Sequence, residues 1–220
     1  ISSSSLTNVN ARHEYLCYFR DMPRRTKQEP IWKPTKEQVA AASKNRVSDV
    51  IDYGLDVLFV GINPGLYSAA VRHHFGRPGN RFWPALNMSD FVPEGEEFLA
   101  FDDCRLPDFG MGITNLCPRA SARADELSKE ELERGARTLT RKVKKYRPRF
   151  VAFLGITSFR TAFGIKGGKV GRQEPTIGDA IVWVLPNPSG LNAHFQLPDI
   201  TNLFNELKRA VDSSKLSRKK

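Results

Sequence analysis

Two asparagines lie in short loops where a side-chain amide could do chemistry: Asn63 within residues 61–65 (GINPG) and Asn187 within residues 187–190 (NPSG). Each stands directly before proline, which pushes the preceding residue into an extended conformation and so presents its side chain at a fixed angle. A carboxamide offers an acceptor oxygen and N–H donors, so it can orient a water molecule or stabilise developing negative charge. The alternative is that both segments are simply turns, because Asn, Pro and Gly are typical turn residues.

The segments before these loops are typical of strands that are buried on both faces of a parallel sheet. We expect such strands at residues 56–61, 150–154 and 180–185, and a further strand or its approach within residues 110–116. Helical patterns lie around and between them, at residues 35–42, 80–88, 128–146, 158–163 and 200–211. Two of these begin with the spacing of a capping box, Thr35 with Gln38 and Ser128 with Glu131. Strands that alternate with helices predict an α/β fold, a three-layer α/β/α sandwich around a mostly parallel central sheet.

The carboxyl ends of the predicted strands are where a ligand should bind. In open parallel sheets, ligands occupy the crevice beyond these ends. Residues 61–65, Asn115, Gly155 and residues 187–190 all lie at or just beyond the carboxyl ends of predicted strands. The sequence therefore predicts that both Asn-Pro loops border one site.

The charge of the chain favours a polyanionic partner. Lys and Arg number 34 against 24 Asp and Glu, a net charge of +10. The excess is concentrated in the amino-terminal segment, in residues 141–149 and at the carboxyl terminus, a distribution that suits nucleic-acid phosphates. A basic membrane-surface patch would use the same residues, but the aromatic residues follow the core pattern. No apolar run approaches the length of about 20 residues that crosses a bilayer.

Composition predicts one domain with basic ends. We expect a loosely ordered arm at residues 1–34, a folded domain at 35–212 and a tail at 213–220. The first residue is Ile, so we expect the natural chain to begin further upstream. The three cysteines are widely spaced and form no CxxC pair, which predicts reduced thiols in an intracellular protein and no zinc site. The basic ends are consistent with the nucleus.

Three segments together carry a resemblance to a known family. Residues 61–66 (GINPGL), 77–83 (RPGNRFW) and 187–191 (NPSGL) resemble the mismatch-specific uracil and thymine DNA glycosylases, a branch of the uracil-DNA glycosylase superfamily, and the likeness spans about residues 50–210. It implies an enzyme of base-excision repair that flips uracil, thymine or another altered base out of DNA. Hydrolysis of the N-glycosidic bond then leaves an abasic site. We expect this enzyme to be a monomer without metal or cofactor that acts on double-stranded DNA.

The resemblance assigns the chemistry to the two amides. Asn63 would hold the attacking water against C1′, and Asn187 would lie beside O2 of the leaving base. An amide cannot take up a full proton, so the resemblance implies a slow enzyme. Phe75 matches the aromatic residue on which the base stacks, although a core phenylalanine is the alternative.

Other residues are assigned to the substrate by the same resemblance. Ser68 would leave room at the pyrimidine C5 edge, and Asn115 would face the base edge as both donor and acceptor. His74 would line the pocket or meet a phosphate. The remaining assignments are Ile62 and Ser121 for the substrate, and Ser189, Gly190, Leu191 and Asn192 for DNA, with Leu191 as the wedge between base steps.

One departure from the family affects recognition of the opposite base. Relatives commonly carry arginine two residues after the wedge, whereas this chain has Ala193 followed by His194. We therefore expect little dependence on an opposite guanine, and action on single-stranded as well as double-stranded DNA. Two other functions remain open: a damaged-DNA-binding protein with weak catalysis that uses the same pocket, and an RNA-binding α/β domain. The latter would need stacking aromatic residues on an exposed sheet, whereas these strands are expected to be buried.

Overall fold

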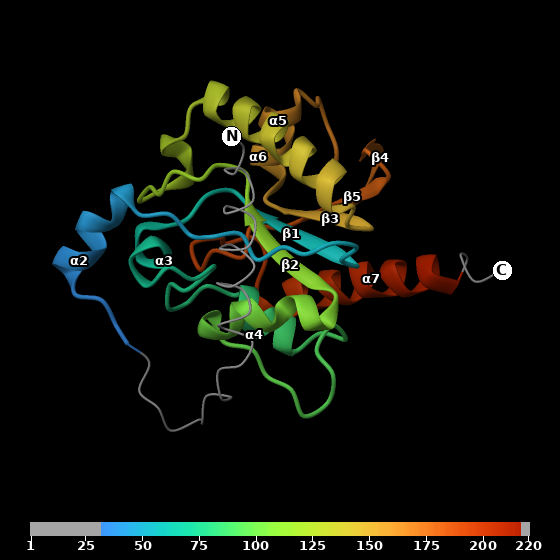
Figure 1. Cartoon of the computed structure of the whole chain (residues 1–220), viewed down its shortest axis with the longest axis horizontal. Helices are drawn as coiled ribbons and strands as arrows, with labels where there is room; N and C mark the ends of the chain where they lie inside the picture. The colour runs from blue at the N-terminus through green and yellow to red at the C-terminus, as the bar shows by residue number, and fades with distance from the viewer. Residues whose placement is uncertain (1–31, 217–220) are drawn as a thin grey trace, which may run out of the picture. The chain divides into compact units, whose positions relative to one another are not determined.

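The computed structural model describes residues 32–216 (Figure 1). The predicted arm therefore lies outside the described residues except for Trp32, Lys33 and Pro34, and so does the end of the predicted tail. Five strands form one sheet in the order β2-β1-β3-β5-β4. They are β1 (Val57–Gly61), β2 (Met111–Asn115), β3 (Phe150–Leu154), β4 (Gly171–Ile177) and β5 (Ala180–Leu185).

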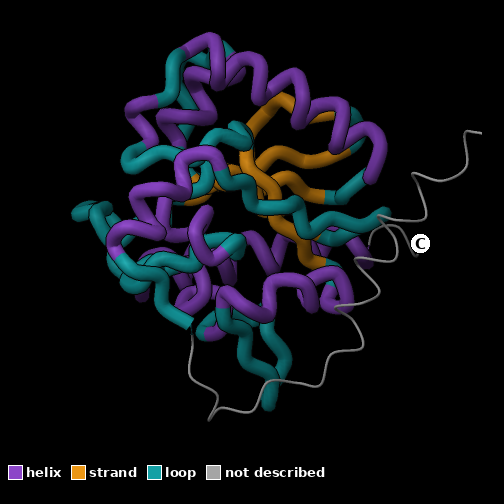
Figure 2. Tube along the Cα trace, turned by 60° about the vertical axis from the view of Figure 1, so that its left-hand side comes forward, coloured by secondary structure: helices purple, strands orange, loops and turns teal. Residues whose placement is uncertain are grey.

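The sheet is parallel except for β4, which pairs antiparallel with β5 at one edge. Helices cover both faces: α4 (Phe82–Asn87) and α7 (Leu197–Leu216) lie on one side, and α5 (Lys129–Tyr146) and α6 (Ile156–Phe163) on the other. Figure 2 shows the strands, in orange, between these helical layers. The predicted α/β/α fold is confirmed.

Alternation along the buried strands builds the two cores. Phe59 of β1 faces α4 and α7, where its ring centroid lies 5.3 Å from that of Phe82 and 5.5 Å from that of Phe204. Its neighbours Leu58 and Val60 pack into the opposite core, with α5 and α6. Successive side chains of a strand point to opposite faces, so a continuous apolar run is what a sheet covered on both sides requires.

Two helices begin at the capping boxes that the sequence indicates. Thr35 Oγ1 accepts the Gln38 N–H at the start of α2 (Lys36–Ala41), and Ser128 Oγ accepts the Glu131 N–H at the start of α5. In both boxes the side chain of the third helical residue returns a bond to the cap's own N–H. The start of α5 lies close to the site described below.

Several elements differ from the expectations. The short helix α3 (Leu66–Val71) and the 3-10 helix η2 (Ala100–Phe109) were not predicted. Strand β4 was not predicted either, because its polar sequence and Pro175 are tolerated only at a sheet edge. Helix α7 continues to Leu216, past the predicted end at 211 and into the segment assigned to the tail.

Two further properties bear on function. Within residues 32–216, no helix combines the length and the apolar character needed to cross a membrane. In the same part of the chain, no group of His, Cys, Asp and Glu side chains is arranged to hold a metal ion.

Candidate active site

A pocket of about 550 Å³ opens at the carboxyl ends of β1, β2, β3 and β5. Every residue assigned above as catalytic or substrate-binding lines it, together with Ser189, Leu191 and Asn192; Gly190 does not. The strand order explains why these residues meet. Strand β1 lies between β2 and β3, at the point where the order of strands reverses and a crevice forms beyond their carboxyl ends. Residues far apart in sequence thus share one cavity.

The Asn63 loop is held by hydrogen bonds that continue the β1–β2 ladder beyond the strands. The Leu116 N–H donates to Gly61 O (2.8 Å), the Cys117 N–H to Ile62 O (2.9 Å) and the Ser121 N–H to Pro64 O (3.2 Å). The loop therefore lies along residues 116–121, which fix its path.

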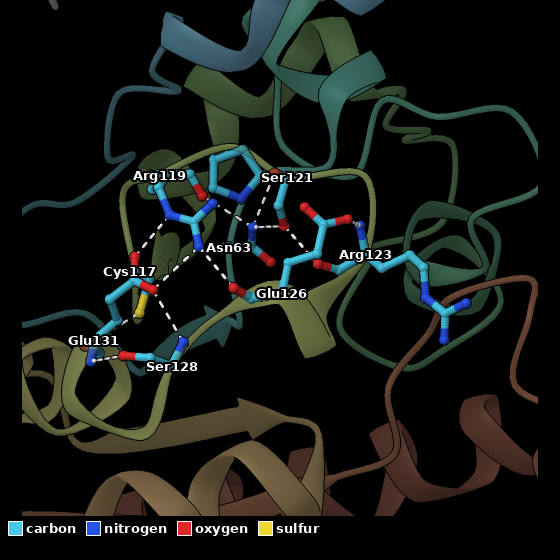
Figure 3. A network of polar contacts seen from close by, with 9 residues as sticks. Asn63, Cys117, Arg119, Ser121, Arg123, Glu126, Ser128 and Glu131 are labelled. Atoms are coloured by element: carbon cyan, nitrogen blue, oxygen red, sulfur yellow. Dashed lines mark hydrogen bonds and ion pairs between the residues drawn. The ribbon is translucent and has the colours of Figure 1, made fainter.

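The Asn63 amide is oriented by this neighbouring segment. Its Nδ2 donates to Arg119 O (2.9 Å) and to Ser121 Oγ (2.7 Å). Ser121 Oγ donates its own proton to Arg123 O (2.6 Å), so it can only accept from Asn63. The side-chain nitrogen of Asn63 must then face residues 119–121, and Oδ1 points away from them (Figure 3). Ser121, assigned from sequence to the substrate, thus contacts Asn63.

Arg119 links the segment that contacts Asn63 to the start of α5. Its guanidinium forms two bonds with the Glu131 carboxylate (2.7 and 3.1 Å) and one with Glu126 O (2.9 Å), as Figure 3 shows. The Arg119 guanidinium, and then the Ser128 N–H, lower the pKa of the Glu131 carboxyl from its usual 4.5 to about 2. Sequence reasoning identified the Glu131 cap but not its second partner.

This lowered pKa predicts how stability changes with pH. A carboxyl whose pKa falls on folding stabilises the protein above its unfolded pKa, and that stabilisation is lost as pH falls through the folded value. We expect E131Q to melt below the wild type at neutral pH and the gap to close between about pH 4.5 and pH 2. Glutamine keeps one acceptor oxygen for the Ser128 N–H and so can still form the capping box, while the charge and the second acceptor for Arg119 are lost.

Melting temperatures of both proteins across this pH range provide the measurement. The control is E133Q, which removes a charge from the same helix but breaks only the contact with Lys129 (3.7 Å). A gap between E131Q and the wild type that stays constant down to pH 2 would contradict the role of the Glu131 charge.

Gly61, Asn115 and Phe75 meet closely at the end of β1. A Cβ on Gly61 would lie 2.5 Å from Asn115 Oδ1 and 3.2 Å from Phe75 Cζ, so only glycine leaves room for both side chains. Phe75 itself has φ +53°, a conformation that costs a bulky residue energy and that clusters at functional sites. Its ring stacks on that of Phe82, with the ring centroids 4.3 Å apart and the ring planes at 27°. Phe75 also lines the pocket. The pocket thus has a supported aromatic wall.

His74 is buried, and protein atoms engage both its ring nitrogens. Nε2 lies 2.9 Å from Ser48 O, which can only accept, so Nε2 carries the proton and Nδ1 is left as an acceptor. Nδ1 lies 3.4 Å from Asn115 Nδ2. Burial lowers the pKa of His74, although the Asp103 carboxylate opposes this, and the ring is neutral at pH 7. The phosphate contact considered above does not fit a buried neutral ring; the side chain instead contacts Asn115.

Ser68 is also buried at the pocket wall. Its Oγ accepts the Gly76 N–H (3.1 Å), which fixes the small side chain in place. The pocket is therefore bounded by a small side chain at this point.

The Asn187 amide is oriented in the opposite sense to that of Asn63. Its Oδ1 accepts the Ser189 N–H (3.0 Å), and no described residue accepts from its Nδ2. The nitrogen is thus the group left for a ligand. The same bond occupies the Ser189 N–H, and the Leu191 N–H donates to Ser189 Oγ (3.3 Å), so neither of these N–H groups is open to a DNA phosphate.

The loop after Asn187 carries an exposed apolar side chain. Leu191 is 77% exposed and borders the pocket, and Ala193 and His194 beyond it are exposed as well. Sequence reasoning assigned no role to Arg81 or Arg119, which hold the two Asn-Pro loops. Arg81 lies inside segment 77–83, which carries part of the family resemblance, and this was the one sequence feature that could have indicated a role for it.

Most of the sequence matches a known protein family. Residues 48–210 match the family described as the uracil DNA glycosylase superfamily. The match covers well over half of the chain and includes every residue that lines the pocket except Val47.

Proposed function

Because the chain belongs to the uracil DNA glycosylase superfamily, whose members are DNA glycosylases, we propose that it flips uracil, thymine or another altered base out of DNA and hydrolyses the N-glycosidic bond. The product is an abasic site, an intermediate of base-excision repair. One observation carries the proposal: two carboxamides line one pocket, Asn63 with its acceptor oxygen unengaged and Asn187 with its donor nitrogen unengaged among the described residues.

The two amides suit the two ends of this reaction. Asn63 Oδ1 accepts a hydrogen bond from a water molecule and aims the water oxygen at C1′. As the bond from C1′ to the base breaks, its electron pair passes to the base, and Asn187 Nδ2 donates to the oxygen where negative charge develops. The water oxygen bonds to C1′ and its proton leaves to solvent. Neither amide takes up a proton, which suits a slow reaction through an oxocarbenium-like sugar.

The pocket wall suits a flat pyrimidine. Phe75 offers a ring for stacking, an interaction worth about 1–3 kcal/mol per base. Asn115 presents donor and acceptor groups to the base edge. Ser68 leaves space for a substituent at C5, which is why we include thymine among the substrates.

Stacking in duplex DNA must be broken before a base can enter the pocket. The exposed Leu191 is an apolar side chain of the kind that inserts between base steps. Basic side chains supply affinity for the backbone phosphates. We further propose that the protein acts as a monomer in the nucleus.

The proposal is tested by base release from a labelled duplex that contains a single uracil. After incubation with excess protein, alkali cleaves the strand at abasic sites, and a gel separates the products. We expect cleavage at the uracil position with uracil and with thymine opposite guanine. A retarded protein–DNA complex without any abasic product would favour the damaged-DNA-binding alternative.

The base opposite the lesion should have little influence. Ala193 carries no group that can bond the orphaned partner base. We expect uracil opposite guanine, opposite adenine and in single strands to be released at rates within roughly tenfold of one another, a difference that reflects only the cost of opening each pair. Single-turnover rates on the three substrates provide the comparison, and a preference of more than a hundredfold for guanine would be inconsistent with this reasoning.

A further inference from the structure

Arg81 binds the loop that carries Leu191 through several backbone carbonyls. Its Nη1 donates to Asn192 O (2.8 Å) and to Phe195 O (2.8 Å), and its Nη2 to Gly190 O (3.4 Å). Its backbone N–H donates to Pro188 O (2.8 Å). One residue thus holds four carbonyls between residues 188 and 195.

The loop and the Arg81 segment also touch through their backbones. A Cβ on Gly190 would lie 2.6 Å from Gly79 O, so the two segments are as close as main chains can pack. Within the loop, Asn192 Nδ2 donates to Asn187 O (2.9 Å). The carbonyls on both sides of Leu191 are therefore fixed, although the Leu191 side chain itself is 77% exposed.

The Arg81 guanidinium is well suited to hold the loop, and its charge is directed at the loop carbonyls. No described carboxylate pairs with Arg81, so its charge-assisted hydrogen bonds go to the loop carbonyls. A planar guanidinium can reach several acceptors at once, whereas the compact ammonium of lysine cannot span them in the same way. Arg81 does not line the pocket, so any effect on base release must act through the loop.

We propose that Arg81 is a positioning residue that holds the loop in the conformation from which Leu191 enters the base stack. The proposal rests on the proposed function. A wedge that is ordered before binding loses less conformational freedom when it inserts. Arg81 should therefore matter where a base must be unstacked from a duplex, and not where the base is already accessible.

This distinction separates positioning of the wedge from general support of the fold. We expect R81Q to release uracil from duplex DNA roughly 10- to 100-fold more slowly than the wild type, the size of effect that a misplacement of about 1 Å can have. Release from single-stranded DNA should stay within about twofold, since the chemistry is unaffected. In the double variant R81Q/L191A the duplex rate should equal that of L191A, because both changes remove the same wedge.

The experiment measures single-turnover rates of R81Q, R81K, L191A and R81Q/L191A on both substrates. The control is R137Q, which removes an exposed charge from α5, outside the pocket lining, and should match the wild type. R81K keeps the charge but not the fork and should behave like R81Q; it provides the same test if R81Q does not fold. A second readout needs no catalysis: in the N63A background, 2-aminopurine beside the uracil should brighten more slowly on mixing when Arg81 is changed.

The outcomes are distinct. Equal losses on duplex and single strands, or an unchanged duplex rate in both Arg81 variants, would overturn the positioning role. Additive losses in the double variant would also overturn it. If the wild type releases no base from either substrate, the proposed function has failed, whereas the fluorescence comparison still tests the role of Arg81.

Discussion

Replacing Asn63 with alanine should reduce uracil release by roughly 10²- to 10⁴-fold, the range attributed to a positioned group that assists proton or water chemistry. The reason is that Oδ1 of Asn63 would no longer orient the attacking water. The affinity for DNA should stay within about twofold, because binding depends on basic side chains and the Leu191 loop. Single-turnover rates and gel-shift titrations of the same protein preparations measure the two quantities.

A milder variant controls for loss of structure. S121A leaves Asn63 in place but removes Ser121 Oγ, which accepts a hydrogen bond from Asn63 Nδ2 at 2.7 Å. We expect a smaller loss than in N63A, since the bond to Arg119 O remains. Equal rates for N63A and the wild type would remove Asn63 from the mechanism.

Replacing Asn187 with alanine should slow uracil release by roughly 10²- to 10³-fold, the cost of losing one donor to a developing anion. The loss should be smaller for 5-fluorouracil, because its electron-withdrawing substituent already stabilises the departing anion. A comparison of the two bases in otherwise identical duplexes therefore tests for the donor itself.

The matched variant is N187D. Aspartate can still accept the Ser189 N–H and so preserve the turn, but it has no N–H to donate. We expect N187D to lose at least as much activity as N187A. Recovery of activity in N187D, or an equal loss for uracil and 5-fluorouracil in N187A, would show that Asn187 only shapes the loop.

The fold could be predicted because its signals are local. The apolar runs of β1, β3 and β5 need burial on both faces, and the capping boxes before α2 and α5 are contained within four residues. The edge strand β4 lacks such a signal, because a strand paired on one side only can keep polar residues and a proline. The exposed position of Leu191 likewise agrees with its expected place on a loop.

The site could be predicted in its members but not in their support. The Asn-Pro loops follow strands, so their meeting at one edge of the sheet follows from topology alone. The orientation of each amide depends on partners that lie far away in sequence. Asn63 is held by Arg119 and Ser121, 56 and 58 residues away, and no local pattern indicates that contact.

His74 and Arg81 illustrate the same limit. A pair of neighbouring histidines is usually polar surface, but His74 is buried, and this burial lowers the pKa of its ring even though Asp103 and the Ser48 carbonyl oppose the change. Arg81 looks like one more basic residue in a basic chain, yet its partners lie 109 to 114 residues further on. Long-range contacts of this kind decide which charges meet DNA and which hold the protein together.

The central claim is that Asn63 and Asn187 act on one nucleotide that has left the helix. A crystal structure of the protein bound to a duplex with 2′-fluoro-2′-deoxyuridine, whose glycosidic bond resists hydrolysis, measures this directly. We predict a flipped uracil against Phe75, with a water molecule between Asn63 Oδ1 and C1′ and with Asn187 Nδ2 about 2.7–3.2 Å from a base oxygen. A uracil that stays stacked in the duplex, or that enters the pocket with either amide out of reach, would contradict the account.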